Sequence, residues 1–309
     1  MKGMMRGHGK TDAWSRRGFL LSAGTAAAGF CAGAASGVEA AVPLVTFGVV
    51  ADCHFADREP LSGRYYRESA GKLAECVSYM NNQGVDFLVE LGDFKDQGQT
   101  PEATVGFLRT IEAVFRKFRG ARYHVLGNHD TDSIAKERFL ENVENTGIPR
   151  MRSYYSFDVE RVHFVALDAN FRADGSPYNS GNFDWRAAYV PPEQIAWLEE
   201  DLGKTERPAI VFIHQLLDAD EGDVFVRNAS GVRRVLERSG KVRAVFQGHH
   251  HEGRYTRRQG IHYYTLKALI TGSGVRNSAY AVVDVYADGG LRVTGLEKAD
   301  SRQLVAPGA

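Results

Sequence analysis

The stretch Val45-Thr46-Phe47-Gly48-Val49-Val50-Ala51-Asp52-Cys53-His54 joins a mostly apolar run to two polar side chains. The run is typical of a buried strand, and Asp52 and His54 follow it directly. In an extended strand, residues two apart point to the same side, so these two side chains can aim at one metal while Cys53 turns away. A carboxylate and an imidazole at a strand end therefore indicate a candidate metal site.

Four more polar motifs each follow an apolar run of strand length. The runs are 87–91, 123–126, 210–213 and 242–246, and the motifs are Gly92-Asp93-Phe94-Lys95-Asp96, Gly127-Asn128-His129-Asp130, His214 and Gly248-His249-His250-His251. We expect the five strand ends to converge on one edge of a sheet. Oxygen and imidazole ligands without thiolate suit a pair of hard or borderline divalent cations. Two such cations side by side make a centre that hydrolyses phosphoesters.

The positions within these motifs indicate candidate ligands. Strand alternation places His249 and His251 on one side and His250 on the other. A carboxylate can bridge two cations, and Asp93 stands just past a strand. The predicted ligands are Asp52, His54, Asp93, Asn128, His214, His249 and His251. Each motif is common by chance on its own, whereas the ordered set is specific. We interpret Asp96 as a loop-capping residue rather than a site residue.

Residues 1–40 have the pattern of an export leader. Ser15-Arg16-Arg17-Gly18-Phe19-Leu20 is a twin-arginine motif, and an uncharged stretch rich in Ala, Gly and Ser follows it. Val38-Glu39-Ala40 fits a signal peptidase site, so we predict cleavage after Ala40. The mature chain, 41–309, would then be periplasmic or secreted, delivered by the twin-arginine export machinery. An uncleaved membrane anchor is the alternative.

The mature chain is long enough for one domain with a substantial core. It has no second long apolar segment, which predicts no stable membrane association after cleavage. The leader holds five Lys/Arg and two Asp/Glu, so the totals of 38 and 38 leave a net charge of −3, which does not suggest nucleic-acid binding. An exported protein can form a disulfide, but we expect Cys53 and Cys76 to be buried and unpaired. The sequence leaves the oligomeric state open.

Strand-like and helix-like segments alternate along the mature chain, which predicts an α/β fold. Helical periodicity is clearest in 65–82, 101–118, 192–202 and 228–238. Consecutive strands at 154–159 and 162–167, and at 279–286 and 291–296, imply a mixed sheet or two packed sheets. Asp288-Gly289-Gly290 predicts a hairpin in the second pair. The stretch 170–190 predicts a long surface loop that caps a site or carries specificity.

The ordered motifs resemble those of the calcineurin-like metallophosphoesterase superfamily, namely D-x-H, G-D-x-x-D, G-N-H-D/E, a separate H and G-H-x-H. The resemblance implies an α/β/β/α sandwich in which two mixed sheets pack together between flanking helices. It implies that His129 lies beside the metals, with Asp130 orienting it. It also implies one metal on Asp52, His54, Asp93 and His251, and a second on Asp93, Asn128, His214 and His249.

The expected reaction is hydrolysis of a phosphodiester, diphosphate or phosphomonoester bond in a small phosphorylated substrate. Two metals lower the pKa of a bridging water and hold hydroxide ready at neutral pH. A protonated His129 would stabilise charge or donate to the leaving oxygen, and Asp130 would favour the imidazolium; a purely structural pair is the alternative. Mn, Fe, Zn and Ca all suit mixed oxygen and nitrogen ligands. A metal-dependent binding protein without catalysis is a further alternative.

A narrower resemblance concerns the substrate. Residues 47–52, the segment Arg64-Tyr65-Tyr66-Arg67-Glu68-Ser69 and the pattern P-x-Q-x-x-W-L within 192–202 look like the manganese-dependent ADP-ribose/CDP-alcohol diphosphatases. This favours Mn and a nucleotide-diphosphate conjugate, with Arg64, Tyr65 and Arg67 contacting phosphate or stacking on a base. The same three residues also fit the amphipathic start of a helix. The chain departs from that group at His54, where its members tend to carry Gln, and this leaves the nucleotide substrate open.

Overall fold

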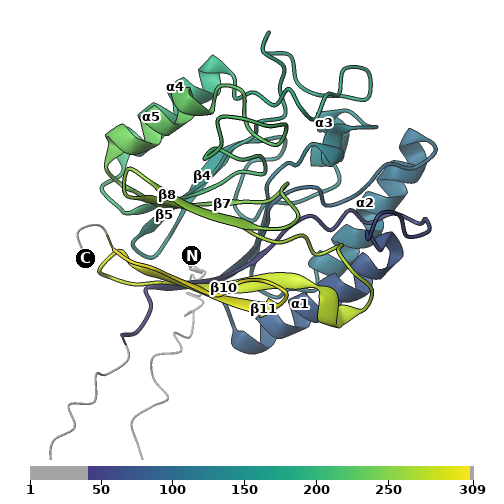
Figure 1. The fold of residues 1–309 in the computed structure, drawn as a ribbon, viewed down its shortest axis with the longest axis horizontal. Coiled ribbons are helices and arrows are strands. Elements are labelled where there is room, and N and C mark those ends of the chain that lie inside the picture. The colour runs from purple at the N-terminus through teal and green to yellow at the C-terminus, as the bar shows by residue number, and fades with distance from the viewer. Residues whose placement is uncertain (1–40, 307–309) are drawn as a thin grey trace, which may run out of the picture. The chain divides into compact units, whose positions relative to one another are not determined.

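The computed structural model describes residues 41–306, which form two mixed sheets between two pairs of helices (Figure 1). The predicted leader and its cleavage site lie outside the described residues. The first sheet has the order β12-β11-β10-β1-β2-β3 and consists of β1 (Val45–Val50), β2 (Phe87–Glu90), β3 (Ala121–His124), β10 (Ala279–Val285), β11 (Leu291–Glu297) and β12 (Arg302–Leu304). The second has the order β4-β5-β6-β7-β9-β8 and consists of β4 (Tyr155–Val159), β5 (Val162–Ala166), β6 (Ala209–Phe212), β7 (Val242–Gln247), β8 (Arg254–Arg258) and β9 (Ile261–Thr265).

Each sheet combines parallel and antiparallel strand pairs. In the first sheet β1 pairs in parallel with β2 and antiparallel with β10. In the second sheet β5, β6 and β7 are parallel neighbours, while β4 pairs antiparallel with β5. Parallel neighbours bring their carboxyl ends to the same edge, where open α/β sheets bind their ligands.

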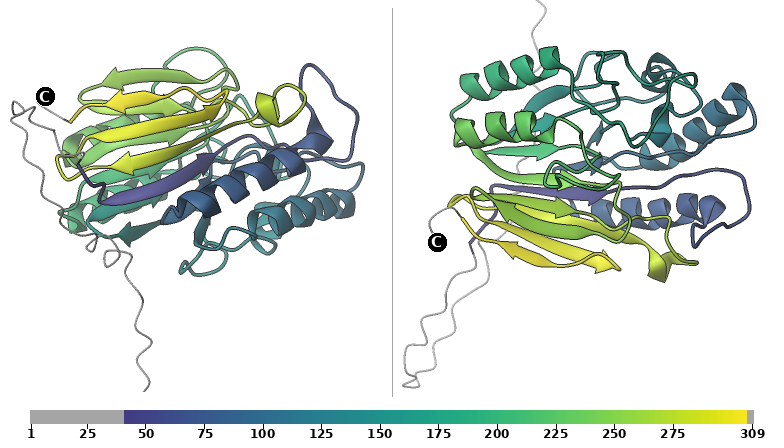
Figure 2. Two further views of the ribbon diagram at one scale, coloured as in Figure 1. Left: turned by 90° about the horizontal axis from the view of Figure 1, so that it is seen from below. Right: turned by 45° about the horizontal axis from the view of Figure 1, so that its top comes forward.

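The helices cover the outer faces of the two sheets (Figure 2). They are α1 (Ser69–Gln83), α2 (Pro101–Phe115), α3 (Lys136–Leu140), α4 (Pro192–Lys204) and α5 (Ala229–Ser239), with short 3-10 turns η2 (Tyr66–Glu68), η3 (His129–Thr131) and η4 (Val275–Asn277). Apolar residues of α1 and α2 share a core with the first sheet, and those of α4 and α5 share one with the second. The predicted α/β/β/α sandwich is therefore confirmed.

Strand β1 contributes to two cores because successive side chains point to opposite faces. Phe47 lies between the sheets, where its ring stacks on Phe87 at a centroid distance of 5.0 Å and meets Phe164 edge-on. Val50 packs on the other face, under α1 and α2. Strands buried on both faces appear as continuous apolar runs, which explains the unbroken run before Asp52.

Most predicted elements are confirmed within a few residues. The first predicted helix instead begins with the separate turn η2, so residues 64 and 65 precede it. The hairpin between β10 and β11, the loop at 170–190 and the two buried free cysteines are as predicted. The sequence predicted neither α3 nor the β8–β9 hairpin nor β12. Among residues 41–306, no helix is both long and apolar enough to span a membrane.

Candidate functional site

All five polar motifs lie just beyond the carboxyl ends of parallel strands. Three follow β1, β2 and β3 of the first sheet, and two follow β6 and β7 of the second. The expectation that they share one edge of a single sheet is wrong, since the motifs converge from both layers of the sandwich. Residues far apart in sequence, such as Asp93 and His214, come within hydrogen-bonding distance there.

Four of the seven predicted ligands have left-handed backbone. The φ angles are 55° at Asp52, 44° at His54, 56° at Asp93 and 68° at His249. Strand alternation is therefore the wrong reason for the shared direction of Asp52 and His54, because β1 already ends at Val50. Non-glycine residues in this conformation cost on the order of 1–3 kcal/mol each, and such strain concentrates at functional sites.

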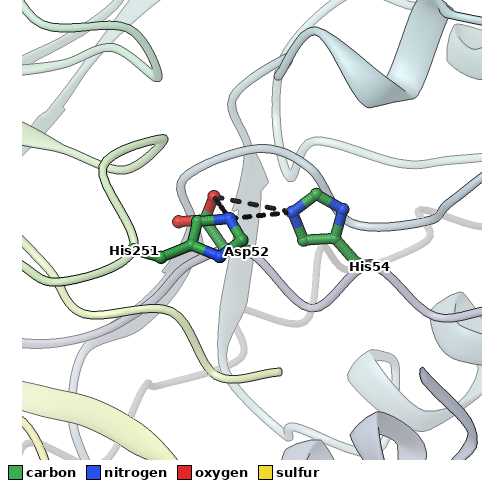
Figure 3. A group of neighbouring side chains, drawn as sticks. All are labelled: Asp52, His54 and His251. Atoms are coloured by element: carbon green, nitrogen blue, oxygen red, sulfur yellow. Dashed lines mark hydrogen bonds and ion pairs between the residues drawn. The ribbon is translucent and has the colours of Figure 1, made fainter. Parts of the chain in front are cut away.

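A first group of converging atoms comes from Asp52, His54 and His251 (Figure 3). Nε2 of His251 lies 3.4 Å from Oδ1 of Asp52, and Nε2 of His54 lies 3.8 Å from the same oxygen. The two Nε2 atoms are 3.2 Å apart. Ligand atoms about 2.1 Å from one cation lie roughly 3 Å from each other. These three side chains can therefore hold one cation.

A second group comes from Asp93, His214 and His249. Oδ2 of Asp93 lies 3.1 Å from Nε2 of His214 and 3.5 Å from Nε2 of His54, so this oxygen stands between the two groups. His214 donates its Nδ1–H to the carbonyl of Leu91 at 2.8 Å, which leaves Nε2 free to coordinate. Asp93 is thus placed to be shared by two cations.

The unpaired polar atoms of the site fit a bound cation. Asn128 Oδ1 and His249 Nε2 are buried and have no hydrogen-bond partner, and the buried His214 Nε2 faces the Asp93 carboxylate at 3.1 Å without a well-aligned hydrogen bond. Buried polar groups in proteins are nearly always satisfied, so each such atom needs an explanation. An amide oxygen and two imidazole nitrogens are all acceptors of a divalent cation. A cation on this group would satisfy all three atoms together.

Charges within the site shift several pKa values in opposite directions. Burial opposes protonation of His214, but Asp93 raises its pKa to about 10. Burial likewise opposes protonation of His54, but Asp52 and Asp93 raise its pKa to about 9. Burial, with the nearby charge of His214, lowers the pKa of His249 to about 3. Protonated His54 and His214 therefore offset the negative charge of Asp52 and Asp93 in the metal-free chain. Bound cations would take over that role.

The glycines of the motifs are required by crowding around the ligands. A Cβ on Gly127 would overlap the backbone nitrogen and the carboxylate of Asp93. A Cβ on Gly248 would lie 2.9 Å from Oδ2 of Asp52. Only glycine lets the backbone approach these side chains so closely without strain. This explains why Gly127 precedes Asn128 and Gly248 precedes His249.

His129 lies beside the two groups, but its predicted partner is wrong. Asp130 does not orient it, because the Asp130 carboxylate accepts the backbone N–H of Gly127 at 2.8 Å and of Asp93 at 3.0 Å. Asp130 therefore supports the loop that carries Asp93. The Nδ1 atom of His129 instead lies 2.9 Å from Oδ2 of Asp132. The sequence motifs do not predict a role for Asp132.

Asp96 combines loop capping with a contact to the site. It accepts the backbone N–H of Gln97 at 2.7 Å, as a capping residue does. Its Oδ2 atom also lies 3.4 Å from Nδ1 of His54, and its Oδ1 atom lies 3.5 Å from Arg58. A carboxylate behind a ligating imidazole orients the ring, so the interpretation of Asp96 as a capping residue alone was incomplete.

The predicted substrate residues divide into two kinds. Arg67 is half-exposed and pairs with the carboxylates of Asp57 and Glu59, each at 2.5 Å. Its charge is therefore neutralised locally. Tyr65 donates its backbone N–H to Ile270 at 3.2 Å.

The charge of Arg64 acts on one residue of the first ligand group. Burial lowers the pKa of His251, Asp52 opposes this shift, and the positive charge of Arg64 adds to the lowering. A backbone bridge to Thr271 holds Arg64 in place. Of the three predicted residues, Arg64 has the charge that acts on the site.

The loop at 170–190 brings two aromatic rings to the site. The ring of Phe183 lies 6.1 Å from that of His129, and the ring of Trp185 lies 6.1 Å from that of His249, measured between centroids. Buried Tyr178 donates its hydroxyl to the carbonyl of Asp184 at 2.6 Å and so holds the loop tip. The composition predicted a loop that caps a site, but it did not show which rings face the site.

Comparison with known proteins agrees with the arrangement of the motifs. Residues 45–253 match the model of the calcineurin-like phosphoesterase family. The chain belongs to this family. It is therefore a metal-dependent phosphoric ester hydrolase, and its ligand groups fit the two divalent cations of a dinuclear centre.

Several relatives match most of the chain. It is 27% identical to a manganese-dependent ADP-ribose/CDP-alcohol diphosphatase of Oryza sativa subsp. japonica, over 86% of this chain and 95% of the relative. It is 25% identical to the protein of the same name from Arabidopsis thaliana, over 86% and 98%. A solved dimetal phosphatase from Danio rerio shares the fold, with a TM-score of 0.74, 21% identity and coverage of 85% of this chain and 99% of that one.

Proposed function

We propose that the chain hydrolyses diphosphate or phosphate ester bonds of small substrates at two divalent cations held by the seven predicted ligands. The observation that carries this proposal is the position of Asp93 between the two ligand groups. One cation would bind Asp52, His54, Asp93 and His251, and the other Asp93, Asn128, His214 and His249. The names of the relatives favour manganese.

The protein's own groups divide the remaining work. Two divalent cations, when bound, supply Lewis acidity to the phosphoryl oxygens and to the attacking water. His129 is a quarter exposed, so its imidazole can reach a substrate and donate a proton to the leaving oxygen. The Asp96 carboxylate, 3.4 Å from Nδ1 of His54, would orient that ring. Asp130 keeps the Asp93 loop in position through its backbone bonds.

A substrate panel run against a metal panel tests this function. The purified chain, freed of metal and then loaded with Mn²⁺, Zn²⁺, Fe²⁺ or Ca²⁺, is assayed with an aryl phosphodiester, an aryl phosphomonoester, ADP-ribose and CDP-choline. We expect turnover of at least one compound that requires added metal. Bound metal without turnover of any compound would instead favour the metal-dependent binding protein, and thermal stabilisation by a substrate without product would support that reading.

A second, narrower proposal is that the substrate is a nucleotide-diphosphate conjugate. The rings of Phe183 and Trp185 beside the site favour it, since aromatic side chains stack on bases. The charge of Arg64 near the site also suits a second phosphate. The relatives are named for ADP-ribose and CDP-alcohols.

Trp185→Ala tests the narrower proposal, with Trp185→Phe as the conservative variant. We expect Trp185→Ala to raise KM for ADP-ribose about tenfold while KM for an aryl phosphate changes little, in line with 1–3 kcal/mol per stacked base. Trp185→Phe should retain most of the affinity. Equal changes for both substrates would show that the ring supports the loop rather than the base.

We further propose export through the twin-arginine pathway, with cleavage after Ala40, on the motif at 15–20. The N-terminal sequence of the protein recovered from the periplasm of an expressing bacterium tests this proposal. We expect it to begin at Ala41, and Arg16→Lys/Arg17→Lys should keep the chain in the cytoplasm. An intact leader on membrane-bound protein would support the anchor.

A further inference from the structure

We propose that Lys95 and Asp132 form a positioning pair that fixes the imidazole of His129 toward the substrate. Lys95 occupies a variable position of the G-D-x-x-D motif, and Asp132 lies outside the predicted motifs. The inference goes beyond the proposed function in naming what orients His129, and it rests on that function only for the reaction His129 serves.

The contacts form a closed chain around one residue. Nδ1 of His129 lies 2.9 Å from Oδ2 of Asp132, and Nζ of Lys95 lies 2.7 Å from Oδ1 of the same carboxylate. The Lys95 ammonium also donates to the backbone carbonyl of His129. The Lys95 ammonium therefore contacts both the carboxylate that faces the His129 ring and the backbone of His129.

The local fold explains why the partner is Asp132 and not its neighbour Asp130. His129 begins the 3-10 turn η3, and Asp132 follows directly after that turn. Side chains three apart eclipse each other in a 3-10 turn, whereas adjacent ones diverge. The backbone N–H of His129 donates to Oδ1 of Asp93 at 2.7 Å, which ties the same turn to the proposed bridging ligand.

Lys95, Asp132 and His129 differ in how deeply their side chains are buried. The Lys95 side chain is fully buried and that of Asp132 is 4% exposed, whereas the His129 side chain is 25% exposed. A buried ammonium is costly unless it is paired and hydrogen-bonded, so Lys95 and Asp132 hold one fixed arrangement. The exposed member of the chain is the imidazole itself.

The carboxylate also determines which ring nitrogen of His129 carries hydrogen. An ionised Asp132 can only accept hydrogen bonds, so Nδ1 of His129 must be the protonated donor. The other nitrogen, Nε2, is then the atom left to exchange a proton with a substrate. Asp96 is a weaker partner, because its Oδ1 atom is 3.9 Å from Nδ1 of His129.

A third metal site is the competing explanation, since Asp96, His129 and Asp132 place donor atoms close together. Lys95 argues against it, because its ammonium already provides the positive charge beside Asp132 and would repel a further cation. The metal content of the loaded chain separates the two explanations. We expect two equivalents in wild type and in Asp132→Asn.

The experiment uses Asp132→Asn, Lys95→Met and the double variant in the full chain. Asp158→Asn is the matched control, because Asp158 accepts from Nδ1 of His163 at 2.8 Å and pairs with Arg207 at the amino end of the parallel strands, opposite the end that carries the site. Each variant is assayed with phenyl phosphate and nitrophenyl phosphate, whose leaving groups differ in their need for a proton. Metal-free samples labelled with [15N]histidine are compared by NMR, with His129→Gln to assign the resonance.

We expect Asp132→Asn to lower kcat for phenyl phosphate about 10- to 100-fold, to lower kcat for nitrophenyl phosphate far less, and to leave KM nearly unchanged. The His129 resonance should lose its Nδ1-protonated signature, while Asp158→Asn changes neither. The double variant removes both buried charges, so it should be more stable than Lys95→Met and still have the same kcat loss.

Three kinetic or NMR results would overturn the proposal. They are equal losses on both esters, an unchanged His129 resonance in Asp132→Asn, and recovery of wild-type kcat in the double variant. A third equivalent of metal that disappears in Asp132→Asn would do the same. If wild type hydrolyses neither ester, the substrate panel decides the proposed function separately, and the NMR comparison on metal-free protein still decides whether Asp132 orients His129.

Discussion

Nε2 of His214 lies 3.1 Å from Oδ2 of Asp93, although the two residues extend from different sheets. The contact places a carboxylate of the first sheet against an imidazole of the second. Burial opposes ionisation of Asp93, but His214 and its neighbours hold the pKa of that carboxyl well below its usual range. A permanently ionised oxygen at this point suits a ligand shared by two cations.

Replacing Asp93 with Asn should therefore abolish most activity. We expect kcat to fall at least about 100-fold, because the amide lacks the negative charge that the shared carboxylate oxygen carries. Metal content measured by mass spectrometry should fall from two equivalents to one or fewer. Asp223→Asn, on an exposed carboxylate, serves as the control and should match wild type. Two bound metals with full activity in Asp93→Asn would contradict the bridging role.

Metal binding should become tighter as pH rises. The pKa of His54 is raised to about 9 and that of His214 to about 10, so both rings carry protons at pH 7 in the metal-free chain. A cation must displace those protons to bind. Titration calorimetry in buffers of different ionisation enthalpy should show proton release near pH 7 that shrinks toward pH 10. Affinity independent of pH between 6.5 and 9 would contradict these protonation states.

The buried His124 should make the metal-free chain less stable in alkali. Burial opposes its charge, but Glu112 at 3.1 Å and Glu90 raise its pKa to about 9. Since this folded value lies above 6.5, the stabilisation is complete below pH 6.5 and is lost as pH rises through 9, on the order of 2 kcal/mol. Urea unfolding at pH 6.5 and 9.5 measures the loss, and His124→Gln should reduce it. If His124→Gln leaves the difference in unfolding free energy between these two pH values unchanged, His124 is not its source.

Gly127→Ala should damage the site, whereas Gly106→Ala should not. The added methyl group at position 127 would overlap Asp93, so we expect loss of bound metal and a lower melting temperature. Gly106 lies within α2 with open space around it, and Ala there should add about 0.5–1 kcal/mol of stability. Thermal unfolding with and without Mn²⁺ compares the two. Normal metal content in Gly127→Ala would mean that the loop containing residue 127 shifts to accommodate the added methyl group.

Arg64 and Arg67 should respond differently to substitution, although they stand three residues apart. Arg64→Ala should lower kcat/KM for ADP-ribose about tenfold or more, since charge-assisted bonds to phosphate are worth roughly 1.5–3 kcal/mol. Arg67→Ala should change it little, because Asp57 and Glu59 already pair with that guanidinium. Both variants are assayed in parallel with nitrophenyl phosphate. Equal losses on ADP-ribose would contradict the division between them.

The sequence predicted the fold and the side chains that converge at the site better than it predicted their surroundings. Residues such as Phe47 gave a clear signal because strands buried on both faces are apolar throughout. The β8–β9 hairpin was missed because β8 is an edge strand rich in Arg and only partly buried. Asp130 was paired with His129 on adjacency, whereas a 3-10 turn brings residue 132 there instead. The direction of the rings in the loop at 170–190 depends on tertiary packing that no periodicity encodes.

The origin of the ligands in both sheets has a consequence for how the chain acquires its metals. Each proposed cation would contact residues from both sheets, so its binding would hold the two sheets together. A species that binds only the folded state stabilises it by about 2.7 kcal/mol at a free concentration a hundred times its dissociation constant. The supply of metal would thus affect the stability of the folded domain as well as its catalytic activity. A chain exported in its folded form would take its metal from the compartment in which it folded.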